Sequence, residues 1–164
     1  ARRNIPYEGV LFCGLMLTDT GPRLIEFNTR FGDPECQALM MRAEGDLLAM
    51  LNDLAHSQMP LRPVTMGANH AITVVMAAPG YPGTPQKGSS ISLPNELGDG
   101  CMIFHAGTKA HGDQFLAQGG RVLNVTATGA SLQEARDKAY DLVGQIDWPE
   151  GYARRDIGHR ALKD

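Results

Sequence analysis

Two oxygen-bearing side chains stand close together in residues 24–28, Leu-Ile-Glu-Phe-Asn. In a strand, whose side chains alternate between two faces, Glu26 and Asn28 point to the same face. A carboxylate and an amide carbonyl side by side are hard ligands suited to Mg²⁺, which takes few protein ligands and fills its other positions with phosphate and water. The spacing therefore predicts a metal site. The alternative is a strand end whose polar side chains are simply solvated.

A charged group follows directly, in the order Thr-Arg-Phe-Gly-Asp-Pro-Glu. Asp33 can cap a helix whose first position is Pro34, and Glu35 then lies in the first turn, where the helix dipole favours a carboxylate. We expect this helix to run to about Ala43. The guanidinium of Arg30 can form an ion pair with Asp33 or Glu35, so a capped helix explains the group without catalysis.

Two strands are expected to position the oxygen ligands. Residues 9–17, Gly-Val-Leu-Phe-Cys-Gly-Leu-Met-Leu, have apolar side chains at both parities, which predicts a strand buried on both faces. Residues 18–22 have the composition of a turn, and residues 23–28 form the next strand. The sequence therefore predicts a β-hairpin with Glu26 and Asn28 near the exit of its second strand.

The rest of the chain combines a short helix, several strands and a long closing helix. Asp46 can cap the short helix, and residues 131–134, Ser-Leu-Gln-Glu, form a capping box that opens the long one. Strands are expected at residues 68–78, 90–93, 102–106 and 121–128. We therefore predict an α+β fold: a hairpin with helices in residues 1–63, and a small, mostly antiparallel β domain with a closing helix in residues 64–164.

Composition and charge describe an ordinary soluble globular protein. Of the 164 residues, 43% are hydrophobic and 20% are charged. With a net charge of -3 and a pI near 5.9, the chain has no overall positive electrostatic field that would attract nucleic acid or an anionic membrane. Neither is therefore expected as a partner. Cys13, Cys36 and Cys101 stand far apart and are odd in number, which favours reduced thiols in the cytoplasm. The opening residues lack a start methionine, which suggests a fragment of a longer protein.

The order Glu-Phe-Asn, Thr-Arg, Phe-Gly-Asp-Pro-Glu resembles the ATP-grasp carboxylate–amine ligases, whose last metal-binding strand carries a Glu-x-Asn pair. Within that superfamily, residues 30–35 with Gln37 resemble the signature of the phosphoribosylamine–glycine ligases, also called glycinamide ribonucleotide synthetases. The resemblance covers essentially the whole chain, because further segments stand in that family's order: residues 14–16, 75–78, 80–83, 104–109, 119–123, 125–127 and 156–158.

The resemblance implies an enzyme of purine biosynthesis in the cytoplasm. ATP would phosphorylate glycine with Mg²⁺ or Mn²⁺ present, and 5-phosphoribosylamine would displace the phosphate to give glycinamide ribonucleotide. Residues 1–63 would then end an ATP-grasp domain, and residues 64–164 would form a barrel-sandwich-like carboxyl-terminal domain. The amino-terminal substrate domain and the two lysines above the ATP phosphates are not in this chain. The missing amino-terminal part of the same enzyme is therefore an implied partner, and this chain alone is expected to be inactive.

The resemblance also assigns roles in the first charged group. Glu26 and Asn28 would hold the metal ion, and Arg30 would be the catalytic contact to the acyl phosphate or the transferred phosphoryl group, a task suited to a permanently charged fork of donors. Asp33 and Glu35 would bind substrate through the amine of glycine or phosphoribosylamine. Helix capping by Asp33 and an ion pair of Glu35 with Arg30 remain the alternatives.

Two cationic residues further along the chain stand in segments that resemble a second binding site of related enzymes. Gly107-Thr108-Lys109 and Gly119-Gly120-Arg121 resemble the Gly-x-Lys and Gly-Arg segments with which related purine-pathway enzymes bind a ribose phosphate. A phosphate needs cationic donors and close glycine backbone, and both segments offer them. A lysine in a hairpin turn is, however, usually only solvated. His105 could reach the same cleft, although a single histidine in an apolar strand is more often structural.

Two other classes of protein remain open. One is a different ATP-grasp ligase, such as a biotin carboxylase-like enzyme, whose matching segment would lack Phe-Gly-Asp-Pro-Glu after the arginine. The other is a non-catalytic barrel-sandwich module in residues 64–164.

Overall fold

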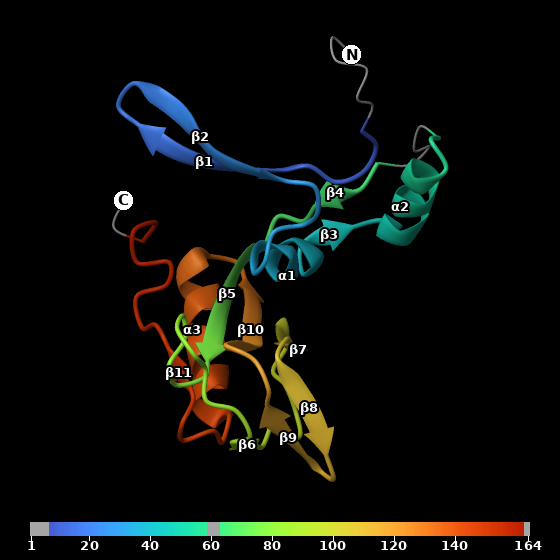
Figure 1. Ribbon diagram of the computed structural model, residues 1–164. Helices are drawn as coiled ribbons and strands as arrows, with labels where there is room; N and C mark the ends of the chain where they lie inside the picture. Colours follow the sequence, from blue (N-terminus) through green and yellow to red (C-terminus); the bar gives the residue numbers. More distant parts are fainter. Residues whose placement is uncertain (1–6, 59–62, 163–164) are drawn as a thin grey trace. The chain divides into compact units, whose positions relative to one another are not determined.

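The computed structural model describes residues 7–58 and 63–162 (Figure 1). The chain divides into two compact units. The first, called the hairpin unit below, comprises Ala1–Cys36 and Ala43–Gly67. The second, the sheet unit, comprises Gln37–Arg42 and Ala68–Asp164. The domain boundary predicted between residues 63 and 64 stays a prediction. None of the described helices combines the length and the apolar character needed to cross a membrane.

The hairpin unit contains the predicted β-hairpin. Its elements are β1 (Phe12–Thr18), β2 (Gly21–Asn28), β3 (Ala43–Glu44), α2 (Leu47–Ala55) and β4 (Thr65–Met66). β1 and β2 pair antiparallel, and the register shifts between Gly14 and Leu15. Asp46 caps α2 as predicted, because its carboxylate accepts a hydrogen bond from the Ala49 N–H at 2.8 Å.

The helix that follows the charged group is shorter than predicted. We expected it to run from Pro34 to about Ala43, and the observed helix, α1, spans Glu35–Met40. Ala43 lies instead in β3, where it pairs with Met66. The strand partner stands far along the chain, so the local pattern of apolar residues could not reveal the end of the helix.

The hairpin buries neither face within its own unit, so the predicted burial of its first strand is wrong. Leu17 is 82% exposed and Ile25 is 62% exposed. Other large apolar side chains of the two strands are exposed as well: Leu15, Met16, Leu24 and Phe27. Two paired strands present two faces, and in the described part of this unit neither face is packed against a sheet or a helix.

A four-stranded antiparallel sheet forms the centre of the sheet unit, in the order β11-β5-β10-β7. The strands are β5 (His70–Ala77), β7 (Cys101–His105), β10 (Arg121–Gly129) and β11 (Tyr152–Ala153). The long closing helix, α3 (Leu132–Gln145), packs against β5 and β10 (Figure 1).

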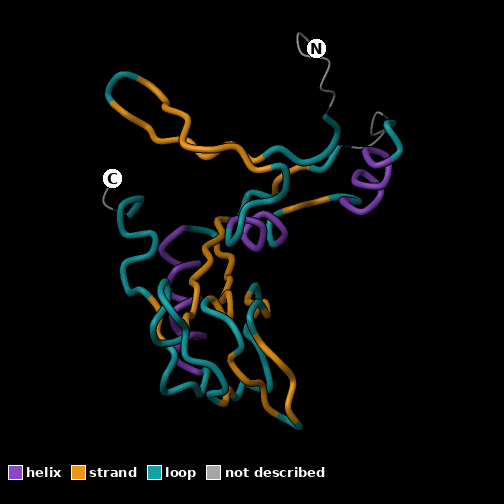
Figure 2. Tube along the Cα trace, viewed as in Figure 1, coloured by secondary structure: helices purple, strands orange, loops and turns teal. Residues whose placement is uncertain are grey.

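A second, three-stranded sheet has the order β6-β9-β8. Its strands are β6 (Ser90–Ile91), β8 (Thr108–His111) and β9 (Gln114–Ala117). Loops, teal in Figure 2, link many of these short strands. The predicted α+β fold, mostly antiparallel and closed by a helix, is confirmed. In the described residues both sheets are open, and no barrel closes.

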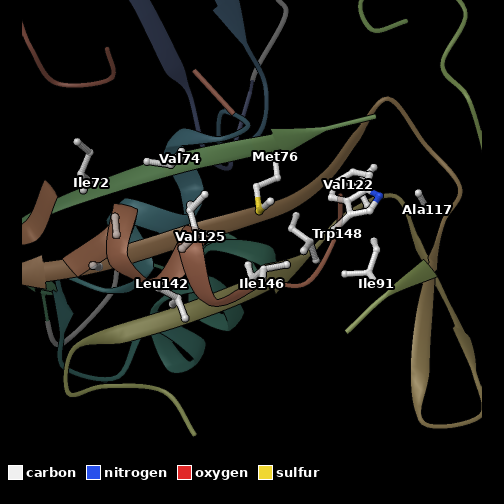
Figure 3. Close-up of a cluster of buried hydrophobic side chains, with 14 of the residues drawn as sticks. Ile72, Val74, Met76, Ile91, Ala117, Val122, Val125, Leu142, Ile146 and Trp148 are labelled. Atoms are coloured by element: carbon white, nitrogen blue, oxygen red, sulfur yellow. The ribbon is translucent and has the colours of Figure 1, made fainter. Parts of the chain in front are cut away.

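The core of the sheet unit lies between the four-stranded sheet and α3 (Figure 3). Val74 and Val125 pair across β5 and β10 and are both fully buried. The buried side chains of α3 are Ala135, Ala139, Leu142 and Val143. Because full burial of a side chain such as valine or leucine contributes about 1.5–3 kcal/mol, the sheet unit has a stabilising core of its own.

The capping box at the start of α3 is present with one change. The Ser131 Oγ accepts a hydrogen bond from the Glu134 N–H at 3.1 Å, as predicted. The Glu134 carboxylate, however, accepts from the Ala130 N–H at 2.8 Å. Glu134 also forms an ion pair with Lys138 at 2.8 Å, and the hydrogen bond from Lys138 lowers the pKa of the carboxyl group.

Candidate functional site

Glu26 and Asn28 lie together at the end of β2, as the strand alternation predicts. The Asn28 Nδ2 donates a hydrogen bond to the Glu26 Oε1 at 3.0 Å. The Glu26 Oε2 and the Asn28 Oδ1 accept no hydrogen bond from any side chain or backbone group in the described part of the chain. Two hard oxygen atoms are therefore available near each other.

Gly14 leaves room for Glu26 across the hairpin. The two residues are partners in the β1–β2 register, and a Cβ on Gly14 would lie 3.3 Å from the Glu26 Cγ. A side chain there would press on Glu26, so the glycine lets the carboxylate extend over β1. No local pattern in the sequence reveals this role, because it depends on which residues the two strands bring opposite each other.

The two oxygen atoms fit a hard divalent cation that is held mainly by its substrate. Mg²⁺ usually binds through one or two carboxylates and keeps positions for phosphate and water. Among residues 7–58 and 63–162, no group of three or more His, Cys, Asp or Glu side chains could hold a metal ion. The Glu26–Asn28 pair therefore suits an ion that arrives with phosphate better than a structural metal centre.

Arg30 forms no ion pair within the described residues, so the predicted alternative of a pair with Asp33 or Glu35 is not observed. Its Nη1 donates to the Phe31 carbonyl oxygen at 2.8 Å, and the side chain is exposed. The Glu35 carboxylate lies instead against Gly32, where a Cβ would collide with it. Within the described residues, the other N–H groups of Arg30 are thus available to donate hydrogen bonds to an anion.

Asp33 contributes to the local electrostatics. Partial burial, and secondly the nearby Asp33 carboxylate, raise the pKa of the Cys36 thiol. A thiol whose pKa is raised above its ordinary value stays protonated at neutral pH. The substrate contacts predicted for Asp33 and Glu35 stay predictions.

Lys109 and Arg121 belong to different strands of the sheet unit, and the backbone links their segments. Lys109 is exposed in β8, and Arg121 is half-buried at the start of β10. The Gly107 N–H donates to the Arg121 carbonyl oxygen at 3.1 Å, and the Gln118 N–H donates to the Gly107 carbonyl oxygen at 2.7 Å. The two glycine-bearing segments singled out in the sequence are therefore neighbours in space.

Glycines allow this close approach. A Cβ on Gly107 would lie 2.7 Å from the Gly119 Cα and 2.8 Å from the Arg121 carbonyl oxygen, which no side chain tolerates. Beside them, the ring of Tyr81 covers Gly120, where a Cβ would collide with the ring. The Gly-Gly pair signalled a close approach at this point, but the sequence did not reveal that Tyr81 is the neighbour.

His105 makes local contacts near Lys109. Its ring centroid lies 4.4 Å from that of Phe115, and its Nδ1 lies 3.0 Å from the Thr108 Oγ1. The side chain has partners, as expected for a structural histidine, but it is exposed and does not belong to the core.

The charged tail is organised by ion pairing and by α3. The Arg154 Nε and Nη2 donate to the two oxygens of Asp156 at 2.8 and 2.6 Å, and this pairing lowers the pKa of Asp156 to about 2. Arg136 of α3 donates to the carbonyl oxygens of Arg155 at 2.8 Å and Ile157 at 3.0 Å. Arg154 and Asp156 thus form an ion pair, whereas Arg155 contributes its backbone carbonyl oxygen to the contacts of the tail with α3.

Family models match most of the chain. The model "Phosphoribosylglycinamide synthetase, C domain" matches residues 71–160, and the model "Phosphoribosylglycinamide synthetase, ATP-grasp (A) domain" matches residues 1–36. The chain belongs to the phosphoribosylglycinamide synthetase family. The resemblance found in the sequence is thereby confirmed, and a biotin carboxylase-like ligase is excluded as the family.

Relatives in the phosphoribosylglycinamide synthetase family carry the name phosphoribosylamine–glycine ligase. The protein from Mesorhizobium japonicum is 54% identical over 163 residues, which is 99% of this chain and 38% of the relative. The chloroplastic protein from Arabidopsis thaliana is 47% identical over 169 residues, which is 99% of this chain and 32% of the relative. The chain thus spans well under half the length of these relatives.

A crystal structure of phosphoribosylamine–glycine ligase from Thermotoga maritima has the same fold. The TM-score is 0.77 and the identity 36%, over 89% of this chain and 36% of that one. All the predicted site residues fall within segments that the phosphoribosylglycinamide synthetase models match: Glu26, Asn28, Arg30, Asp33 and Glu35 in the ATP-grasp segment, and Lys109 and Arg121 in the C domain.

Proposed function

We propose that the protein to which this chain belongs is a phosphoribosylamine–glycine ligase. The carboxylate of glycine attacks the γ-phosphorus of ATP, and ADP leaves. The amine of 5-phosphoribosylamine then attacks the acyl carbon of glycyl phosphate, and phosphate leaves as the amide forms. The observation that supports this most is the Glu26–Asn28 pair, joined at 3.0 Å within the segment that matches the ATP-grasp model.

Glu26 and Asn28 would hold Mg²⁺ or Mn²⁺ at the ATP phosphates. The free oxygen of each side chain is a suitable ligand, and Gly14 leaves the space that the carboxylate needs. When bound, the ion neutralises negative charge on the phosphates, which phosphoryl transfer requires.

Arg30 would bind the transferred phosphoryl group and the acyl phosphate. Its guanidinium is exposed and without an ion pair in the described residues, so its remaining N–H groups can donate to phosphate oxygens. Such donors stabilise charge that develops during the transfer, and the phosphoryl group itself needs no protein nucleophile.

The other predicted residues would bind the two substrates that are joined. Asp33 and Glu35 are exposed carboxylates that can accept hydrogen bonds from the amine of glycine or of 5-phosphoribosylamine. Lys109 and Arg121 would bind the ribose phosphate, supported by the glycines that bring their segments together.

The rest of a longer ligase would supply the groups that this chain does not contain, including the lysines over the ATP phosphates. We place that enzyme in the cytoplasm, with small-molecule substrates and with neither nucleic acid nor a membrane among its partners. The 164-residue chain by itself should neither hydrolyse ATP nor form the amide, and ligase turnover by the purified chain would refute this part of the proposal.

The test replaces Glu26 with Gln in the full-length enzyme. We expect ADP formation that depends on glycine and 5-phosphoribosylamine. In Glu26→Gln we expect a Mg²⁺ requirement raised about tenfold or more, because losing even a hydrogen-bond partner of a metal ligand typically costs about 10- to 100-fold in affinity. Direct Mn²⁺ titration should show the same weakening.

Glu44→Gln is the matched control, because Glu44 is an exposed glutamate of the hairpin unit outside the proposed site. Unchanged Mg²⁺ dependence in Glu26→Gln, or an equal effect of Glu44→Gln, would contradict the metal assignment. An active enzyme with no dependence on glycine would contradict the proposed reaction.

A further inference from the structure

An exposed tyrosine stands beside the glycine backbones that join the segments of Lys109 and Arg121. Tyr81 lies in the loop after β5, and a Cβ on Gly120 would collide with its ring. The ring therefore rests on the Gly120 backbone, one residue before Arg121. None of the roles proposed for the ligase uses this tyrosine.

Backbone hydrogen bonds fix the position of Tyr81 relative to Gly120. The Ala78 N–H donates to the Gly120 carbonyl oxygen at 2.9 Å, and the Tyr81 N–H donates to the Ala78 carbonyl oxygen at 3.2 Å. Ala78 thus links the two residues directly. Gly80 has a φ of +89°, and a Cβ there would collide with the Thr84 carbonyl oxygen, so the loop is tightly folded. The ring is therefore presented by a well-anchored backbone.

The phenol of Tyr81 is accessible to a ligand. The residue is 38% exposed, and within the described residues its hydroxyl forms no hydrogen bond. The Tyr140 hydroxyl, by contrast, donates to the Arg154 carbonyl oxygen at 2.6 Å. A phenol donates one hydrogen bond and can accept others, so the Tyr81 hydroxyl has an unused donor. Because the ring already rests on Gly120, a ligand need not order it on binding.

Bare glycine backbone and a cation lie next to the ring. Gly119 directly precedes Gly120, and a Cβ on Gly107 would lie 2.7 Å from the Gly119 Cα, so no side chain separates these backbones. Lys109 follows two residues after Gly107, is exposed and forms no ion pair within the described residues. A phosphate can approach backbone that carries no side chain, and it takes hydrogen bonds from ammonium and hydroxyl groups. This part of the sheet unit offers both kinds of donor.

We propose that Tyr81 is a further substrate-binding residue of the ligase and that its hydroxyl donates a hydrogen bond to the phosphate of 5-phosphoribosylamine. The proposal rests on the proposed function, in particular on the ribose-phosphate site of Lys109 and Arg121. Glycine carries no phosphate, so the Tyr81 hydroxyl selects for the phosphorylated sugar and leaves the binding of glycine unchanged.

Steady-state kinetics of the full-length enzyme test the proposal through Tyr81→Phe, which keeps the ring on Gly120 and removes only the hydroxyl. We expect the KM for 5-phosphoribosylamine to rise about tenfold or more, the loss typical of a hydrogen bond to a charged group. The kcat, the KM values for glycine and ATP, and the thermal midpoint should stay the same. Tyr152→Phe is the matched control, because it removes the hydroxyl of another exposed tyrosine, in β11, and should change none of these values.

Tyr81→Leu separates binding by the hydroxyl from a structural role of the ring. If the ring only packs on Gly120, Tyr81→Phe will behave as the wild type and Tyr81→Leu alone will lose activity and thermal stability, which would overturn the proposal. Lys109→Met tests the site on which the proposal rests. A raised KM for 5-phosphoribosylamine in Lys109→Met with an unchanged KM in Tyr81→Phe would reject the role of Tyr81 alone.

Calorimetric titration of the full-length enzyme with ribose 5-phosphate tests Tyr81 independently of turnover. If ADP formation does not depend on 5-phosphoribosylamine, the proposed reaction itself fails, and this titration then decides on Tyr81. A loss of affinity of about tenfold in Tyr81→Phe would support the proposal. Undiminished affinity in this variant, or a wild-type enzyme that does not bind ribose 5-phosphate, would overturn it.

Discussion

The hairpin unit and the sheet unit use similar apolar sequences with opposite results. β10 is buried along most of its length, because β5 and β7 pair with it and α3 covers the sheet. β1 and β2 are as apolar, yet their side chains are mostly exposed. The comparison teaches that an apolar strand is buried only where another layer exists to cover it. The sheet unit contains both layers, whereas the hairpin holds Glu26 and Asn28, the proposed metal ligands, without a second layer of its own.

The largest expected effect comes from placing a charge in each unit. Val125 is fully buried, so Val125→Asp should destabilise the sheet unit by about 4 kcal/mol or more. Leu17 is 82% exposed, and Leu17→Asp should change stability by less than about 0.5 kcal/mol. Urea unfolding followed by far-ultraviolet circular dichroism, which reports on the backbone of both units, measures both. Similar losses in the two variants would show that the hairpin is buried after all.

A smaller loss is expected where glycine backbones touch in the sheet unit. In Gly107→Ala, the new Cβ would lie 2.7 Å from the Gly119 Cα, and the required separation should cost about 1–3 kcal/mol. Gly98→Ala is the control, because its Cβ would meet only the Cys101 Sγ at 3.9 Å. Urea midpoints should fall for Gly107→Ala alone. A shift of the same size at Gly98 would mean that lost backbone freedom, and not the contact, explains the effect.

The helix caps of α3 and α2 allow the stabilities of the two units to be compared through the loss of a single hydrogen bond. Ser131→Ala removes the cap of α3 and should cost the sheet unit about 1 kcal/mol. Asp46→Ala removes the equivalent bond of α2, a helix with no fully buried residue, so its loss should remain local. Trp148 fluorescence should report a lower urea midpoint for Ser131→Ala only. A lower midpoint in Asp46→Ala would indicate that the units unfold together.

The smallest effect is a pH dependence in the tail. The pKa of Asp156 is lowered from 3.8 to about 2 by Arg154, so the stability from this pair is present above pH 3.8 and is lost as the pH falls through about 2. Both side chains are exposed, and added salt should weaken the effect. The difference in thermal midpoint between the wild type and Asp156→Asn should shrink over this pH range. A constant difference would contradict the pairing.

Local chemistry predicted much of this fold. The alternation in residues 23–28 placed Glu26 and Asn28 together, Asp46 marked a helix start, and Ser131 with Glu134 marked another. These features depend on residues within a few positions of each other. The family followed from the continuous signature in residues 30–35, together with further segments that stand in the family's order along the chain.

What the sequence could not predict depends on partners far along the chain. The predicted end of α1 was wrong because Ala43 pairs with Met66. The predicted burial of β1 was wrong because an apolar pattern does not show whether another layer of the fold covers the strand. The contact of Tyr81 with Gly120 is also a long-range feature. Each requires the three-dimensional arrangement of segments that no local spacing encodes.

Hydrogen–deuterium exchange on the 164-residue chain tests the central comparison most directly. If the sheet unit is complete and the hairpin lacks a covering layer, the amides of β5 and β10 should exchange only by global unfolding, and those of β1 and β2 should exchange rapidly by local opening. Equal protection of the two pairs of strands would contradict this account, because it would mean that the hairpin carrying Glu26 and Asn28 is as stably covered as the core sheet.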